Sequence, residues 1–414
     1  MTKIFIKNVR VFDSEVIGDP GNVVFTRSAG NIQDPLADGS EAETSDCVVD
    51  GRGCTLLPGF IDVYTNIKGA NAALGTFASH GVTTVIDLSS NTQQCQALRV
   101  YAAGRTSLST FLTSGTEATP AKDYQPQLYD SPDEVVIRTR EDALRYVSAR
   151  SSGPDRADFI KVVVDTHSQT DDILKALVDA AHAHGKLTIA RTAGKASYER
   201  AMLAGFDIFA HAPLDAALDP AMARDMSAQG KIFVPTLAMM RRRALAGESD
   251  VSTAATTTGA GSGGRPSGAP SQRRDDNSAD PGSIQHADPG VVAGGDYANA
   301  TATVRTLNAA GVTICAGTTA NLIQGAQIPF GESLHEELRL LVEDAGMSRL
   351  DVLRSATCVA AKAFRLSDRG IVRGGLRADL VLVEGNPLED ISVTRNIRRI
   401  WIQGEEVDPV NIAA

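Results

Sequence analysis

The sequence predicts an α/β protein: a (β/α)8 TIM barrel with a small β-sandwich domain built from both chain ends. Three observations support this fold class. Strand-like and helix-like patterns alternate through the middle of the chain, as in parallel β/α folds. Both chain ends carry short runs of strand-like alternation. With 414 residues, the chain has room for a barrel of about 250 residues and a smaller domain.

The chain ends, residues 1–57 and 366–414, are expected to form the small β-domain. The first part contains KIFIKNVRVF, GNVVF and CVVDGRGCTLL, and the last contains RADLVLVEG and IRRIWIQGEEV. These segments are short and rich in Val, Ile and Phe, which is typical of strands. We therefore expect strands from the two ends to pair beside the barrel.

The barrel is expected over residues 58–365. Its strands are predicted at residues 59–68, 82–89, 107–115, 157–165, 186–194, 207–213, 231–239 and 312–320. Helices are predicted at residues 71–80, 94–103, 139–149, 171–185, 198–205 and 298–310. The helix over 171–185 is amphipathic and ends in glycine, a common helix stop.

One segment, at about residues 247–295, does not fit the barrel pattern. It is rich in Ser, Thr, Ala, Gly, Pro and Asp and has almost no large apolar residues. Such a stretch buries too little surface to offset the entropy of ordering it. We predict a flexible insertion after the seventh strand, either a surface loop or a lid that orders over substrate.

Composition restricts the classes of partner. A net charge of −10 and a pI near 5.3 argue against nucleic acid and anionic membranes. The N-terminus has no signal-peptide pattern, and no run of about 18 apolar residues predicts a membrane span. The five cysteines have no CxxC spacing, so we expect free thiols. A cytoplasmic protein acting on a small molecule is the resulting expectation.

Two motifs resemble the amidohydrolase superfamily. The segment CTLLPGFIDVYTNI resembles the pattern LPGFIDxHxH on that family's first barrel strand. The segment LRSATCVAAKAFRLSDRGIVRGGLRADLVLVEGNPL resembles its C-terminal pattern over a long, gap-free stretch. The sequence is identified as a divergent member, similar to the imidazolonepropionase and prolidase branch, and the resemblance implies the barrel fold and makes a homodimer possible.

The resemblance also implies a site at the strand ends, but most of its metal ligands are replaced. The family holds metal with HxH on strand 1, Lys on strand 4 and His on strands 5 and 6, beside a catalytic Asp on strand 8. The corresponding residues here are Tyr64 and Asn66, Lys161, Arg191, His211 and Thr319.

The chemistry of these replacements argues against a metal. A zinc-type site needs about three His, carboxylate or thiolate ligands. A phenol, an amide and a hydroxyl are poor substitutes, and the Arg191 guanidinium would repel a divalent cation. We therefore expect no metal ligands and no cofactor.

The replacements suggest acid–base chemistry instead. Lys161, Arg191, His211 and Tyr64 are the candidate catalytic residues, and Asn66 and Thr319 are candidates for substrate binding. The Arg191 charge would replace that of the metal, Lys161 would act as base or form a Schiff base, and His211 would transfer protons. Each of these four residues also has a structural alternative. Lys161 would pair with Asp165 or another carboxylate, and Arg191 would form salt bridges at the mouth of the barrel. His211 would be a hydrogen-bonded histidine of the core, and Tyr64 would pack in the pocket.

Three functions remain open on the sequence. The first is a metal-independent enzyme that eliminates, isomerises, decarboxylates or cyclises a small organic molecule. The second is a hydrolase of cyclic amides or other C–N bonds, as the resemblance implies. The third is a non-catalytic protein that binds a ligand or partner on the same fold.

Overall fold

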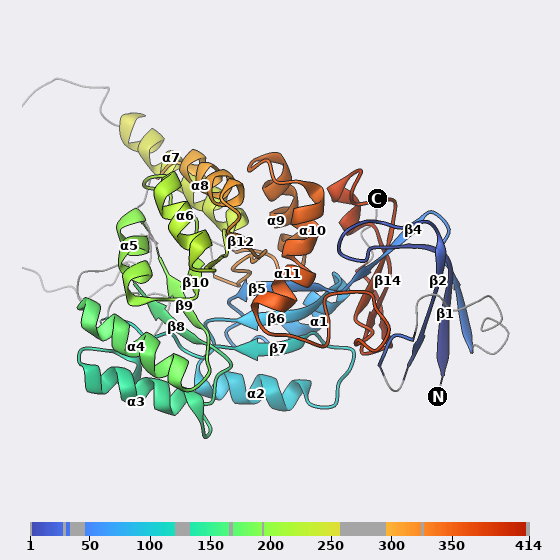
Figure 1. Cartoon of the computed structure of the whole chain (residues 1–414), viewed down its shortest axis with the longest axis horizontal. Coiled ribbons are helices and arrows are strands. Elements are labelled where there is room, and N and C mark those ends of the chain that lie inside the picture. The colour runs from blue at the N-terminus through green and yellow to red at the C-terminus, as the bar shows by residue number, and fades with distance from the viewer. Residues whose placement is uncertain are drawn as a thin grey trace, which may run out of the picture.

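The computed structural model describes residues 2–27, 30–33, 46–120, 133–164, 169–192, 194–256, 295–323 and 327–410, with backbone alone for 247–256. Figure 1 shows a β-rich part at one end of the molecule and a larger α/β part beside it. The blue N-terminal strands and the red C-terminal strands lie together in the β-rich part.

The β-rich part is one seven-stranded sheet in the order β15-β14-β13-β4-β1-β2, with β3 paired to β1. Its strands are β1 (Lys3–Val11), β2 (Gly21–Thr26), β3 (Cys47–Asp50), β4 (Cys54–Pro58), β13 (Leu380–Glu384), β14 (Ile397–Ile402) and β15 (Glu405–Val407). The antiparallel β4–β13 ladder joins the two chain ends, as the sequence predicts. Strand β1 bends the sheet, because its start pairs with β2 and β3 and its end pairs with β4.

Eight short parallel strands form the centre of the α/β part. Strands β5 (Phe60–Thr65), β6 (Val82–Asp87) and β7 (Thr110–Thr113) form one sheet. Strands β8 (Ile160–Val163), β9 (Thr188–Arg191), β10 (Ile208–Ala210), β11 (Ile232–Phe233) and β12 (Thr313–Ile314) form the other. Isolated parallel bridges at Ala118–Val162 and Thr65–Ala320 connect the edges of the two sheets.

The seventh predicted strand, residues 231–239, is mostly not a strand. Only Ile232–Phe233 pairs as β11, and helix α7 (Leu237–Thr256) begins soon afterwards. Pro235 has no N–H for a ladder. The N–H groups of Leu237 and Ala238 donate instead to the buried Glu337 carboxyl, which caps the helix start.

Helices surround the parallel strands. They include α1 (Ala72–Ser79), α2 (Thr92–Ala102), α3 (Arg140–Ser151), α4 (Asp171–Ala183), α5 (Lys195–Ala204) and α8 (Tyr297–Ala309), which coincide with the six predicted helices. The remainder were not predicted from the sequence: α6 (Pro220–Ala228), α7, α9 (Glu332–Glu343), α10 (Arg349–Ser355) and α11 (Cys358–Ala363), with the short 3₁₀ helices η2 (Asp133–Val135) and η3 (Ile391–Arg395). Helices α3 to α6 lie along the outer side of β8 to β10 (Figure 1). No helix in the described ranges is long and apolar enough to cross a membrane.

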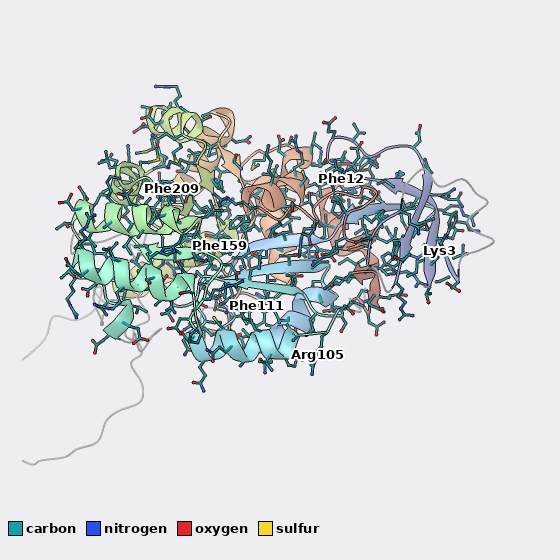
Figure 2. All side chains as sticks on the ribbon, turned by 60° about the horizontal axis from the view of Figure 1, so that its bottom comes forward. Lys3, Phe12, Arg105, Phe111, Phe159 and Phe209 are labelled. Atoms are coloured by element: carbon teal, nitrogen blue, oxygen red, sulfur yellow. The ribbon has the colours of Figure 1, made fainter. Side chains whose placement is uncertain are left out.

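The space between the parallel strands is filled, as expected for a small barrel-type core. One apolar cluster takes side chains from several strands and from α11: Ile61, Ile86, Ile189, Ile208, Ile232, Cys315, Ala360 and Phe364. Phe159 packs edge-on against Phe364 at 5.4 Å and lies among the central strands in Figure 2. This packed apolar cluster also includes Tyr64, one of the candidate site residues.

The predicted flexible insertion is only partly within the described residues. Residues 247–256 continue α7, which corrects the expected start of the insertion at residue 247. The helix extends because α7 is capped by Glu337 and packs against α8 and α9. Residues 257–294 lie outside the described ranges, so the lid hypothesis remains a prediction.

His335 on α9 links three distant segments. One ring nitrogen lies 3.1 Å from Thr394 Oγ1 and the other 3.0 Å from the His80 carbonyl oxygen. Its ring also meets Phe60 edge-on at 5.5 Å. Burial lowers the pKa of His335 from 6.5 to about 3, so the folded protein keeps the ring neutral.

His335 should therefore make the protein less stable in acid. The unfolded chain binds a proton on this ring near pH 6.5, whereas the folded chain does not until about pH 3. The free energy of unfolding should fall as the pH drops below 6.5. The variant His335→Gln should lower stability by about 1–3 kcal/mol at neutral pH and flatten this pH dependence. Urea unfolding at several pH values measures both effects, with His184→Gln, an exposed helix-end residue, as control. If the free energy of unfolding depended on pH equally in His335→Gln and in the wild type, the low pKa assigned to His335 would be contradicted.

Candidate active site

The structure brings the four candidate catalytic side chains together. Tyr64 lies near the end of β5, Lys161 in β8, Arg191 at the end of β9 and His211 directly after β10. All four are buried. Lys161 Nζ lies 4.9 Å from the centre of the Tyr64 ring, and the Tyr64 and His211 rings are 4.8 Å apart.

Lys161 forms a buried ion pair with Glu117. The distance from Lys161 Nζ to Glu117 Oε2 is 2.6 Å, and Nζ also donates to the Leu88 carbonyl oxygen at 2.9 Å. The backbone explains the contact, because Ala118, next to Glu117, pairs with Val162, next to Lys161. The alternative partner Asp165 lies outside the described residues.

This ion pair argues against two roles predicted for Lys161. An ammonium held by a carboxylate is a fixed positive charge, whereas a base or a Schiff-base nucleophile must be a neutral amine. The sequence predicted an ion pair of Lys161 with Asp165 or another carboxylate, and the structure shows that Glu117 is this carboxylate. Lys161 is therefore better suited to stabilise negative charge than to accept a proton.

His211 is buried and hydrogen-bonded to Thr236. Its Nδ1 lies 2.8 Å from Thr236 Oγ1, and the single Thr236 hydroxyl proton is donated to the Pro235 carbonyl oxygen at 2.7 Å. When the Thr236 hydroxyl donates to Pro235 in this way, Nδ1 carries the ring proton and Nε2 keeps a lone pair. Burial, aided by the charges of Arg191, Arg243 and Lys161, holds the pKa of His211 well below its usual 6.5. The ring is neutral at neutral pH.

Tyr64 is held as a neutral phenol. Burial raises the pKa of Tyr64, although the Lys161 and Arg191 charges oppose this shift. A phenol that stays protonated is able to donate a hydrogen bond, and the Tyr64 ring centre lies 4.9 Å from Lys161 Nζ and 4.8 Å from the His211 ring centre. Tyr64 also packs within the apolar cluster between the strands, so it combines the packing and polar roles that the sequence left open.

The two candidate substrate-binding residues differ in their surroundings. The Asn66 N–H donates to the Ala320 carbonyl oxygen at 2.9 Å, and the buried side-chain Oδ1 accepts no hydrogen bond within the described part of the chain. The Thr319 N–H donates to the Tyr64 carbonyl oxygen at 2.7 Å, and the Thr319 hydroxyl donates to the Thr318 carbonyl oxygen. Asn66 thus retains a free acceptor, whereas Thr319 mainly ties the end of β5 to the chain after β12.

Asp62 and Gly317 fix the position of Tyr64. Asp62 accepts hydrogen bonds from Thr318 Oγ1 at 2.6 Å, the Thr318 N–H at 3.1 Å and the Tyr64 N–H at 3.2 Å. Burial raises the pKa of Asp62 to about 7. A Cβ on Gly317 would lie 2.8 Å from Tyr64 Cβ and 2.7 Å from Val234 Cγ1, so only glycine fits there.

Sequence reasoning missed Glu117, Lys68, Arg243 and Thr236. Glu117 lies four residues after the end of β7, and its place just beyond a strand's carboxyl end was the available clue. Lys68 is half-buried beyond β5, and burial lowers its pKa against the opposing charges of Glu117 and Asp87. Arg243 is in the Arg-Arg-Arg run of α7, where sequence alone does not tell which side chain faces inward.

The site does not fit the metal that the resembled family uses. No three His, Cys, Asp or Glu side chains gather into a possible metal site within the described ranges. The replaced ligand positions hold a phenol, an amide, a guanidinium and a hydroxyl, and Lys161 is an ammonium paired with Glu117. Cations at these positions repel a divalent ion, so we derive no step through a metal.

The comparisons with known proteins agree with this architecture. The sequence matches the Amidohydrolase family over residues 55–407. A crystal structure of a Xaa-Pro dipeptidase with bound methionine has a TM-score of 0.76 at 22% identity, covering 98% of this chain and 99% of that one. A putative prolidase from Bifidobacterium longum has a TM-score of 0.75 at 20% identity, covering 98% and 94%. The A. niger ochratoxinase has a TM-score of 0.70 at 18% identity, covering 99% and 96%.

No curated protein sequence matches the chain. The similar structures are all below 25% identity, so they show a shared α/β fold of the TIM-barrel type. The family match, in contrast, covers far more than half of the sequence, and the chain therefore belongs to the Amidohydrolase family.

Proposed function

We propose that the chain hydrolyses a C–N bond of a small organic molecule, with fixed cations in place of the family's metal. The observation that carries this proposal is the buried His211, whose pKa is held well below 6.5 by burial and by the charges of Arg191, Arg243 and Lys161, because a neutral imidazole keeps one nitrogen lone pair. Similar structures are described as a dipeptidase, an ochratoxinase and a molinate hydrolase. These descriptions favour hydrolysis over the elimination, isomerisation, decarboxylation or cyclisation expected first from the sequence.

We also infer the finer architecture on which the site depends. The two parallel sheets are taken as one closed (β/α)8 barrel, because bridges join both pairs of edges. The bent terminal sheet is taken as a small β-sandwich, since its two halves share one apolar core that includes Phe25 and Trp401. In this arrangement, His211, Arg191 and Glu117 all lie at carboxyl ends of barrel strands, where barrel enzymes hold their sites.

The proposed reaction needs only groups of this chain and water. His211 Nε2 removes a proton from water, and the hydroxide oxygen bonds to the carbonyl carbon of the substrate. The carbonyl oxygen becomes an oxyanion, which the Lys161 and Arg191 cations and the Tyr64 phenol stabilise. The C–N bond then breaks, and the His211 imidazolium returns its proton to the leaving nitrogen. A low imidazolium pKa favours this last transfer.

Two other functions would use the same residues: proton-transfer chemistry on the substrate, and ligand binding without catalysis. Experiments distinguish them from hydrolysis. Proton transfer without water would change the substrate but release no amine. A non-catalytic ligand-binding protein would bind without turnover. A cytoplasmic location, a small-molecule substrate, the absence of nucleic-acid or membrane partners, and a homodimer remain part of the proposal.

The variant His211→Asn should lower kcat by about 100-fold or more, because the proton acceptor is lost. Amine release from a panel of dipeptides, N-acyl amino acids and lactams measures the effect. His182→Asn, which changes an exposed histidine paired with Asp207 on the surface, is the matched control and should leave kcat unchanged. Equal activity of His211→Asn and the wild type would overturn the assignment of the base.

The pH dependence should reveal the charged surroundings of His211. Because its pKa is well below 6.5, kcat/KM should not fall as the pH decreases to 6.5. The variant Arg191→Gln removes one of the positive charges that lower the pKa of His211 and should move this acid limb upward, toward the ordinary histidine value. An acid limb already at 6.5 in the wild type would argue against a depressed pKa.

Activity should not depend on a divalent metal. After dialysis against EDTA, turnover should stay within about twofold of the untreated enzyme, because the site cations already supply the positive charge. Elemental analysis should find less than about a tenth of an equivalent of Zn, Mn, Fe, Ni or Co in active protein. Loss of activity that added metal restores would contradict the mechanism.

A further inference from the structure

We infer that Glu337 of helix α9 is a positioning residue for His211, whose ring it holds through Thr236, the residue directly before helix α7. This inference rests on the proposed function only in taking His211 as the group that transfers the proton. It goes further by giving a role in the site to a side chain of α9, which takes no part in the proposed reaction.

The first link joins α9 to the start of α7. Glu337 is fully buried, and its two carboxyl oxygens accept the N–H groups of Leu237 at 2.9 Å and Ala238 at 2.7 Å. These are the first two residues of α7. The first N–H groups of a helix have no acceptor within the helix, and burying one without a partner costs about 1–3 kcal/mol. Glu337 therefore fixes the backbone at the point where α7 begins.

The second link is the backbone conformation of Thr236. Its φ is 55°, in the left-handed region, which is unfavourable for a β-branched residue. The Thr236 carbonyl oxygen accepts the N–H groups of Met239 and Met240, both at 3.0 Å, so this residue is tied to the first turn of α7. An unfavourable φ persists only where the surrounding contacts impose it. Without the Glu337 contacts we expect Thr236 to relax to a negative φ, which would turn its side chain.

The third link joins Thr236 to the His211 ring. Thr236 Oγ1 lies 2.8 Å from His211 Nδ1 and donates to the Pro235 carbonyl oxygen at 2.7 Å. That carbonyl oxygen also accepts the N–H of Ala212, the residue after His211, at 3.0 Å. The hydroxyl thus connects the chain after β11 with the chain after β10. It contacts the ring at the nitrogen opposite the one that is proposed to accept the proton from water.

The backbone of His211 has separate anchors, so Thr236 acts on the ring. The His211 N–H donates to the Thr192 carbonyl oxygen at 3.1 Å, and its carbonyl oxygen accepts the Tyr198 hydroxyl at 2.5 Å. Among the residues that the structure describes, Thr236 is the one hydrogen-bond partner of the ring. The partner at one nitrogen determines which nitrogen of a neutral imidazole has the proton. A displaced Thr236 hydroxyl would therefore let both tautomers form.

Nitrogen NMR of the protein with isotope-labelled histidine tests the inference. A neutral imidazole in one tautomer gives separate signals for its protonated and unprotonated nitrogens, and tautomer exchange moves the two signals together. The His211 signals are those that disappear in His211→Asn. In Glu337→Gln they should shift toward each other, because the glutamine NH2 group does not accept the second helix N–H. The kcat value should fall by at least about tenfold, with KM within about twofold.

The variant Glu336→Gln is the matched control. Glu336 is next to Glu337 on α9 and also contacts α7, through its bond with Arg242 at 2.8 Å, but this ion pair is partly exposed. Its loss should leave the His211 signals and kcat unchanged. A purely structural role of Glu337 predicts a lower free energy of unfolding of Glu337→Gln with wild-type His211 signals in the folded protein. That result would overturn the inference.

Variants of Thr236 test the path between the two residues. Thr236→Ala should shift the His211 signals as Glu337→Gln does, whereas Thr236→Ser keeps the hydroxyl and should retain the wild-type signals. The double variant Thr236→Ala with Glu337→Gln should show no further shift, because both changes act through one contact. Additive shifts would overturn the path. If Glu337→Gln does not fold, as judged by circular dichroism, Glu337→Asp replaces it. The shorter side chain should shift the signals in the same direction, and unchanged signals would overturn the inference.

The NMR test is separate from the test of hydrolysis. The expected shift of the His211 signals, with no amine release from any substrate, would overturn the proposed hydrolase and leave the role of Glu337 standing. Amine release by the wild type, with equal His211 signals in Glu337→Gln and the wild type, would overturn the role of Glu337 alone.

Discussion

The buried ion pair between Lys161 and Glu117 is the interaction on which the rest of the site depends. Removing two charges from water costs several kcal/mol for each ion, and only close contact with further hydrogen bonds offsets it. Here the ions are 2.6 Å apart, and the Leu88 carbonyl oxygen accepts a second bond from Lys161. The Tyr64 ring covers the same ammonium at 4.9 Å. The pair therefore fixes the positions of β8, the chain after β7 and the end of β5 together.

That fixed charge also determines the protonation of its neighbours. His211 stays neutral because burial and the charges of Arg191, Arg243 and Lys161 oppose an imidazolium, and Thr236 holds the ring through Nδ1. Tyr64 stays a phenol because burial outweighs the pull of Lys161. The site thus places a neutral imidazole and a neutral phenol beside cations, which is the basis of the hydrolysis that we propose.

The contacts that hold the scaffold are separate from the residues at the candidate ligand positions. Asp62 ties β5 to Thr318, and the absence of a side chain on Gly317 allows the close approach of Tyr64. The terminal sheet still joins both chain ends through β4 and β13. None of these contacts requires a metal, so substitutions such as Arg191 at the strand ends leave the fold intact.

The sequence by itself determined the order of the strands and six of the helices, because hydrophobic alternation and helix caps are local properties. Tyr64, Lys161, Arg191 and His211 became candidates through the resemblance of their motifs to the amidohydrolase superfamily. Only the tertiary structure showed the Glu117 partner of Lys161 and the start of α7 at Leu237, within the last predicted residues of the seventh strand. The carboxyl of Glu337 caps that helix from 100 residues away. Contacts between segments so far apart depend on packing, and no local pattern encodes them.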